Sequence, residues 1–181
     1  MEEKRGVLYL EASPGTHDTL RDARMESASL VFGEGEGWLS QAQTALWELR
    51  KRCAWICVAA GRGGAGAAAA LAAQLPVDRL ALAGSQLFDR SGPRLQGQAA
   101  RLERFARRNL ALVISEVMLI GATDREIQGF ISLFGRRRVC ALEACGENFL
   151  TASWAQVNEN NLLIPGKCVY YTRNSILTPD D

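Results

Sequence analysis

The chain has 181 residues, of which 48% are hydrophobic and 23% are charged, as is typical of one globular domain with a full core. Its 21 Lys and Arg balance its 20 Asp and Glu, so no overall charge draws it to nucleic acid, membranes or acidic substrates. The acidic start of the chain, followed by a short apolar run, fits neither a signal peptide nor a membrane span. We therefore expect a cytoplasmic protein.

Apolar runs alternate with helix-like segments in the first half of the chain. Residues 6–10 and 29–32 predict short strands, and helical spacing of apolar residues predicts a helix over 41–52, with Ser40 as its N-cap. Residues 54–60 are apolar throughout, which is expected of a parallel strand buried on both faces.

The second half continues the alternation, beginning with an Ala-rich helix over 65–75 that ends at Pro76. The further predicted elements are strands over 79–83, 117–120 and 139–142 and helices over 96–109, from 125 onward and over 149–157, with Asp124 capping the helix from 125. Such alternation predicts an α/β fold, a three-layer sandwich with a mostly parallel central sheet.

The tail differs in character from the rest, with a polar break, a Pro-Gly turn and a predicted edge strand over 167–172. We assign 1–157 to the main domain. We assign 158–181 to a C-terminal extension packed on the domain or on a partner.

Five cysteines, Cys53, Cys57, Cys140, Cys145 and Cys168, suggest free thiols rather than a disulfide framework. A zinc site built from the first four is the alternative, but neither pair has the usual spacing of two intervening residues. We expect buried apolar cysteines, no metal and no cofactor.

The run Gly61-Arg62-Gly63-Gly64-Ala65 makes a sharp turn between a predicted strand and a predicted helix. With the order of the other elements, it resembles the nucleophile elbow of the α/β-hydrolase family over roughly residues 6–154. The resemblance implies that family's fold and places Gly63, which carries no hydroxyl or thiol, where the nucleophile belongs. Asp124, directly after a strand, matches the family's acid.

The position of the family's catalytic histidine is occupied by Glu147, and the only histidine of the chain is His17, in the first loop. The family's triad order is therefore not met, and an attacking oxygen has no obvious general base. The resemblance implies a degenerate member that lacks both the nucleophile and the histidine.

Gly61, Gly63 and Gly66 also match the Gly-x-Gly-x-x-Gly turn of dinucleotide-binding proteins. Such a turn would bind pyrophosphate at the N-terminus of the helix. The following strand, however, ends at 81–85 without an acidic residue to bind a ribose, and two strands precede the motif. Dinucleotide binding remains an alternative, beside glycines that simply allow close packing.

Basic residues cluster in the predicted helix over 96–109 and again at 136–138. We interpret both clusters as solvated surface and consider nucleic acid an improbable partner, because no interleaved aromatic residues suggest base stacking.

The hypothesis favoured by these observations is a pseudoenzyme that binds a small-molecule ligand or a protein partner, with no membrane partner and with homo-oligomerisation left open. Two alternatives remain. One is an ester or thioester hydrolase with an unorthodox site, for which Asp124, Glu147 and His17 are the catalytic candidates. The other is a dinucleotide-binding protein. The predicted binding residues are Gly61, Gly63, Gly64, His17, Asp124 and Glu147.

Overall fold

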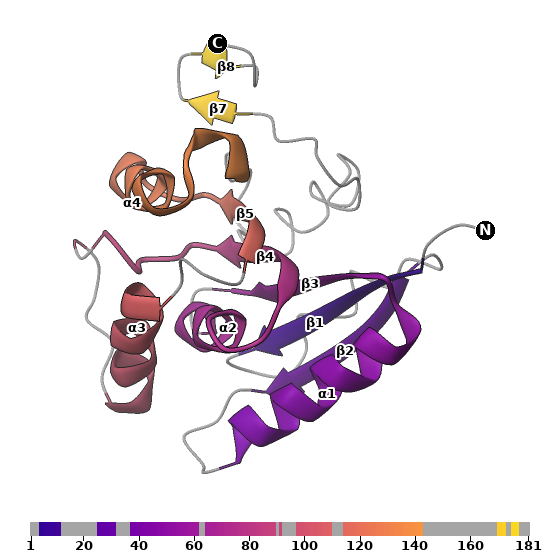
Figure 1. Cartoon of the computed structure of the whole chain (residues 1–181). Helices are drawn as coiled ribbons and strands as arrows, with labels where there is room; N and C mark the ends of the chain where they lie inside the picture. Colours follow the sequence, from indigo (N-terminus) through magenta and orange to yellow (C-terminus); the bar gives the residue numbers. More distant parts are fainter. Residues whose placement is uncertain are drawn as a thin grey trace.

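The computed structural model describes residues 4–11, 25–31, 37–61, 64–89, 91, 97–109, 114–142, 170–172 and 175–177, and the statements below concern these residues. They form one sheet of eight strands in the order β2-β1-β3-β4-β5-β6-β7-β8 (Figure 1). Every neighbouring pair is parallel except β7 and β8. The strands are β1 (Arg5–Glu11), β2 (Met25–Val31), β3 (Trp55–Ala60), β4 (Val77–Ala83), β5 (Ile114–Ile120), β6 (Val139–Leu142), β7 (Tyr170–Thr172) and β8 (Ser175–Leu177).

The strand order reverses direction once. The chain passes from β1 to β2 on one side and then returns across β1 to form β3 on the other side, after which β4, β5 and β6 follow in order. The connections that leave β1 and β3 therefore start in opposite directions, which makes a topological switch point at the carboxyl ends of these two strands. Ligands of open α/β sheets bind outside such a point.

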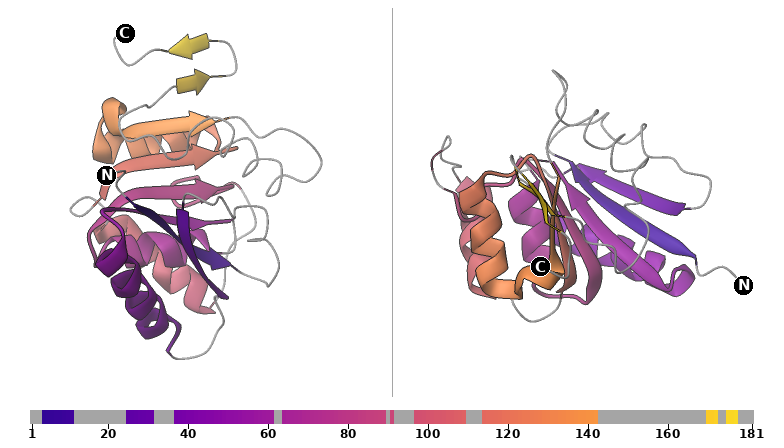
Figure 2. Two further views of the ribbon diagram at one scale, coloured as in Figure 1. Left: turned by 90° about the vertical axis from the view of Figure 1, so that its right-hand side faces the viewer. Right: turned by 90° about the horizontal axis from the view of Figure 1, so that it is seen from above.

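The helices of the described residues pack on the same face of this sheet (Figure 2). Their buried side chains join one core with alternate strand residues such as Leu8, Ile56 and Leu80. The residues between them, such as Val7, Cys57 and Ala81, form a second core on the opposite face. The helices are α1 (Trp38–Arg52), α2 (Ala65–Ala72), α3 (Gly97–Asn109) and α4 (Asp124–Phe134), with a short 3-10 helix, η3 (Arg136–Arg138).

The parallel α/β architecture predicted from the sequence is confirmed. Among the described residues the helices form one layer, and the helix predicted over 149–157 lies outside them. In the tail, β7 pairs in parallel with β6 through Ala141 and Tyr170, so it joins the sheet of its own chain.

Two predicted helix caps are wrong. Helix α1 begins at Trp38 with Gly37 as its N-cap, and Ser40 is exposed within the helix. The helix starts earlier than predicted because the Trp38 side chain packs in the core. Helix α4 begins at Asp124 itself, and its N-cap is Thr123, whose Oγ1 accepts from the backbone N–H of Glu126.

Two strands are longer than their apolar runs. Strand β2 begins at Met25 and β5 at Ile114, each starting before the segment predicted. Both extensions carry a glutamate. Glu26 pairs with Lys4 and Arg52, and Glu116 pairs with Arg79. Ion pairs and cross-strand register therefore hold these polar residues in strands that hydrophobicity alone does not reveal.

Candidate ligand-binding edge of the sheet

The turn after β3 lies against the end of β1. The N–H of Gly64 donates to the carbonyl of Gly61 over 3.0 Å, which closes the turn, and the carbonyl of Gly64 accepts from Ala68 in the first turn of α2. A Cβ on Gly64 would lie 2.4 Å from the carbonyl oxygen of Leu10. Real Cβ atoms do not approach backbone this closely, so glycine is required here by contact with β1.

Helix α2 continues this close packing. All eight of its residues are buried. Seven of them are glycine or alanine, and the eighth is Leu71. It lies between α1 and α3 (Figure 1). Small side chains let the helix backbone approach the sheet and its neighbours closely, as the sequence predicts. The start of α2 is thereby fixed at the switch point.

A buried carboxylate organises the next part of the edge. Glu126, in the first turn of α4, has no exposed surface. Its carboxylate accepts from the Ser85 hydroxyl and from the backbone N–H groups of Leu87 (2.8 Å), Phe88 (2.6 Å) and Asp89 (2.8 Å). These four donors come from the loop after β4, so one side chain of α4 fixes a loop nearly forty residues earlier in the chain.

Asp89 ties the same loop to the end of β5. Its carboxylate accepts from Thr123 Oγ1 over 2.6 Å and from the backbone N–H of Ser91 over 3.0 Å. The bond from Thr123, followed by those from Ser91 and by the charge of Arg125, lowers the pKa of Asp89 to about 2. This carboxylate is therefore ionised and occupied as an acceptor at neutral pH.

Strands β4 and β5 leave the sheet in the same way. Gly84 and Gly121, the residues directly after them, both have positive φ, at 63° and 58°, and the N–H of Gly84 donates to the carbonyl of Ile120. Both loops thus turn at glycines and are then joined by the Glu126 and Asp89 hydrogen bonds. The result is a braced pair of loops beside the glycine turn.

The structure brings three predicted site residues to one edge. Gly61 and Gly64 lie at the carboxyl end of β3, and Asp124 lies at the carboxyl end of β5 with an exposed side chain. His17, Gly63 and Glu147 lie outside the described residues, so their predicted places at this edge stay predictions.

The residues that organise the edge were missed by the sequence analysis: Ser85, Asp89, Thr123 and Glu126. One signal was available. Thr123-Asp124-Arg125-Glu126 has the spacing of a capping box and would have identified Thr123 as the N-cap. A capping box would also place the Glu126 side chain on the backbone N–H of Thr123. In the structure this side chain instead accepts four hydrogen bonds from the loop after β4.

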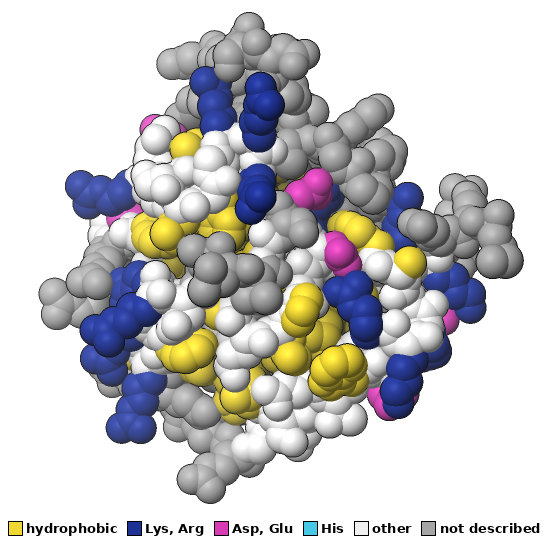
Figure 3. Space-filling view, viewed as in Figure 1, with side chains coloured by type: hydrophobic (Ala, Val, Ile, Leu, Met, Phe, Trp, Pro, Cys, Tyr) yellow, Lys and Arg dark blue, Asp and Glu magenta, His cyan; other side chains and the backbone are white. Residues whose placement is uncertain are grey.

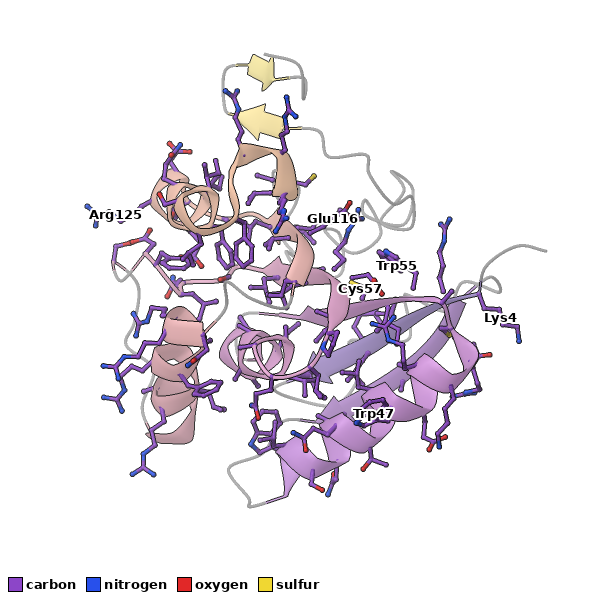
Figure 4. The ribbon with its side chains drawn as sticks, in the orientation of Figure 1. Lys4, Trp47, Trp55, Cys57, Glu116 and Arg125 are labelled. Carbon is purple, nitrogen blue, oxygen red and sulfur yellow. The ribbon has the colours of Figure 1, made fainter. Side chains whose placement is uncertain are left out.

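The second face of the sheet carries a different polar group, at the amino-terminal half of the strands. Arg79, only 1% exposed, donates to Glu116 through Nε over 3.0 Å and lies over the Trp55 ring, 5.5 Å from its centroid. Figure 4 labels Trp55 and Glu116 of this group. This group lies away from the carboxyl edge and stabilises the sheet interior.

Three of the five cysteines fall in the described residues, and all three are buried free thiols as predicted. Cys53 belongs to the core on the helix side, whereas Cys57 and Cys140 belong to the opposite core. Burial raises the pKa of Cys57 to about 12, so the group is a neutral thiol. Because Cys53 and Cys57 are on opposite faces, they do not form one zinc site.

None of the described helices is long and apolar enough to cross a membrane. No family model matches the chain, and no curated protein does so either. A solved structure reported for LipS and LipT, two metagenome-derived lipolytic enzymes, does match. The identity is 12%, the match covers 88% of this chain and 92% of that one, and the TM-score is 0.64.

At this identity the match shows the fold alone. Together with the parallel sheet and the glycine turn after β3, it defines a protein with an α/β-hydrolase-like fold.

Proposed function

We propose that the protein is a non-catalytic α/β-hydrolase-like protein that binds a small ligand at the carboxyl edge of its sheet. The observation that carries the proposal is the turn at the switch point. Gly64 is closed against Leu10 with no room for a side chain, and residue 63, which corresponds to the nucleophile position, is glycine. The turn 61–64 thus carries no hydroxyl or thiol that could attack a ligand.

The acid side of the edge supports the same conclusion. Glu126 accepts from four donors of the β4 loop, and Asp89 accepts from Thr123 and Ser91. Carboxylates engaged in this way hold loops in place and are poorly placed to activate water. A braced loop pair is a suitable rigid wall for a ligand, because little ordering is needed on binding.

The test is a screen of short- and medium-chain esters and thioesters with the wild type, Gly63→Ser, and Gly63→Ser with Glu147→His. We expect an inert wild type and weak activity in the double variant, because a nucleophile and an imidazole are then restored in the family's positions. Gly63→Ser alone and Glu147→His alone are the matched controls. Turnover by the wild type would contradict the proposal.

A hydrolase with an unorthodox site is the second candidate, and the exposure of Asp124 at the same carboxyl edge of the sheet favours it. In that case Asp124, Glu147 or His17 would direct a water molecule to the substrate. Asp124→Asn would then abolish the wild-type turnover. Glu48→Gln, an exposed acid-to-amide change on α1, would leave that turnover unchanged.

Dinucleotide binding is tested separately, since Gly61-x-Gly63-x-x-Gly66 runs from the end of β3 into the first turn of α2. Calorimetric titration with NAD and NADP measures it directly. We expect no heat of binding, because β4 ends at Ala83 and is followed by Gly84-Ser85, without an acidic residue for the ribose.

A further inference from the structure

We propose that the outer face of α3 binds single-stranded nucleic acid. This surface, called the α3 arginine face below, consists of Arg101, Arg104, Phe105 and Arg108. It lies outside the carboxyl edge and is independent of the function proposed there.

The four side chains share one side of the helix. With 3.6 residues per turn, positions 101, 104, 105 and 108 fall within an arc of about 100°, over about 10 Å of helix length. All four are exposed, whereas Ala106 on the other side of the helix is fully buried in the core. Figure 3 shows Lys and Arg side chains gathered along the lower left border of the molecule, where α3 lies in Figure 1. The arginines therefore form one continuous surface.

The charge of this surface is unbalanced. The first turn of α3 has no acidic residue, and within the described part of the chain Arg101, Arg104 and Arg108 form no ion pair. Like charges three and four residues apart destabilise a helix. The arrangement is therefore unfavourable for the free protein and is relieved by a polyanion.

Phe105 distinguishes among polyanions. The sequence analysis found no aromatic residue suited to base stacking, but it overlooked Phe105, which is 39% exposed on the same side of α3 as the arginines. Proteins that bind single strands combine a basic track for phosphates with exposed aromatic rings on which bases stack. Arginine suits phosphate, because its planar guanidinium donates two parallel hydrogen bonds.

Other anionic partners fit this surface less well. Bases in a duplex are already stacked and would not reach an aromatic ring on the outside of a helix. A membrane surface requires a wide apolar helix face, but the apolar side of α3 is packed in the core through Ala106. An acidic peptide would use the arginines without needing the ring.

The test is fluorescence anisotropy of labelled oligo(dT) and oligo(rU), each of about 12 nucleotides, with the intact protein. We expect binding that weakens as salt rises from about 50 to 200 mM. Arg104→Gln with Arg108→Gln should weaken binding about tenfold and reduce the slope of log K against log salt by about 1.4, for two lost phosphate contacts. Binding of only one of the two strands identifies it as DNA or RNA.

The matched control is Arg137→Gln with Arg138→Gln, which removes the same charge from exposed residues of η3. It should change affinity by less than about twofold. Phe105→Ala should weaken binding about tenfold with an unchanged salt slope, since stacking releases no counterions. Phe105→Tyr keeps an aromatic ring and should bind as tightly as the wild type. Far-ultraviolet circular dichroism checks that each variant is folded.

Three results would overturn the proposal. The first is absence of oligonucleotide binding at low salt, with or without binding to anionic vesicles. The second is an equal loss in the η3 control, which would indicate general charge attraction. The third is competition by polyaspartate at equal charge together with normal binding by Phe105→Ala, which would make the surface a site for acidic proteins.

Discussion

Two neighbouring regions of the same sheet edge are held in place by opposite means. The turn after β3 is fixed by the lack of a side chain, since Gly64 lies directly against the carbonyl of Leu10. The loops after β4 and β5 are fixed by side chains, since Glu126 and Asp89 accept hydrogen bonds across them.

The difference shows how one edge of the sheet can be rigid on both sides of the proposed ligand site. Steric contact tolerates no added atom, whereas a buried carboxylate tolerates no lost donor or acceptor. Substitutions should therefore act in contrasting ways in the two regions, and the following experiments test the contrast.

The largest effect is expected for Glu126→Ala. It leaves the Ser85 hydroxyl and three backbone N–H groups without their acceptor in a buried site, so the free energy of unfolding should fall by about 4 kcal/mol. Urea denaturation measures it. Gln128→Ala, an exposed change on the same helix, should cost less than about 0.5 kcal/mol. Equal losses for both variants would contradict the bracing role of Glu126.

Gly64→Ala should lower the free energy of unfolding by about 1–3 kcal/mol, because its Cβ meets backbone that cannot move aside. Gly6→Ala is the graded control. Its Cβ would lie 3.0 Å from Cys53 Sγ, a side-chain atom that can shift, so the loss should be smaller. If Gly64→Ala proves as stable as the wild type, the turn is not closed against β1.

Thr123→Val should destabilise the protein by about 1–2 kcal/mol, because it removes both the N-cap of α4 and the donor to Asp89. Thr123→Ser keeps both hydrogen bonds and should recover most of the loss. The thermal midpoints of the two variants measure the difference. A serine variant as unstable as the valine variant would contradict this role of the hydroxyl, because serine keeps it.

The smallest effect is a pH dependence from Asp89. Its pKa is lowered from 3.8 to about 2 by the bonds from Thr123 and Ser91, so it stabilises the fold above about pH 4. That contribution is lost as the pH falls toward about 2. The difference in urea midpoint between the wild type and Asp89→Asn should therefore shrink over this interval. A difference that stays constant would mean that Asp89 has an ordinary pKa.

Much of the fold could be predicted from local sequence. The apolar run at 54–60, the glycine turn and the Ala-rich helix were placed nearly as the structure has them, because burial on both faces and small side chains leave clear patterns. The starts of β2 and β5 were missed at Glu26 and Glu116, where ion pairs with other elements hold polar residues in strands.

The candidate site was only half predicted. Gly61, Gly64 and Asp124 were identified from turn geometry and from their place after strands. Glu126 and Asp89 were not, since the hydrogen bonds of Glu126 to the loop after β4 and of Asp89 to Thr123 join residues 34 to 41 positions apart in the chain. Phe105 was overlooked because its exposure depends on which side of α3 faces the core.

The sequence by itself determined the alternation of strands and helices, the glycine-rich turn after β3 and the buried character of the three described thiols, because each follows from the residue types or their local spacing. Only the tertiary structure decided that Gly64 meets Leu10, that Glu126 braces the loop after β4 and that Phe105 of α3 is exposed. The first two contacts join residues far apart in the chain, and the exposure of Phe105 depends on which side of α3 packs on the core, so close packing of the folded elements decides all three.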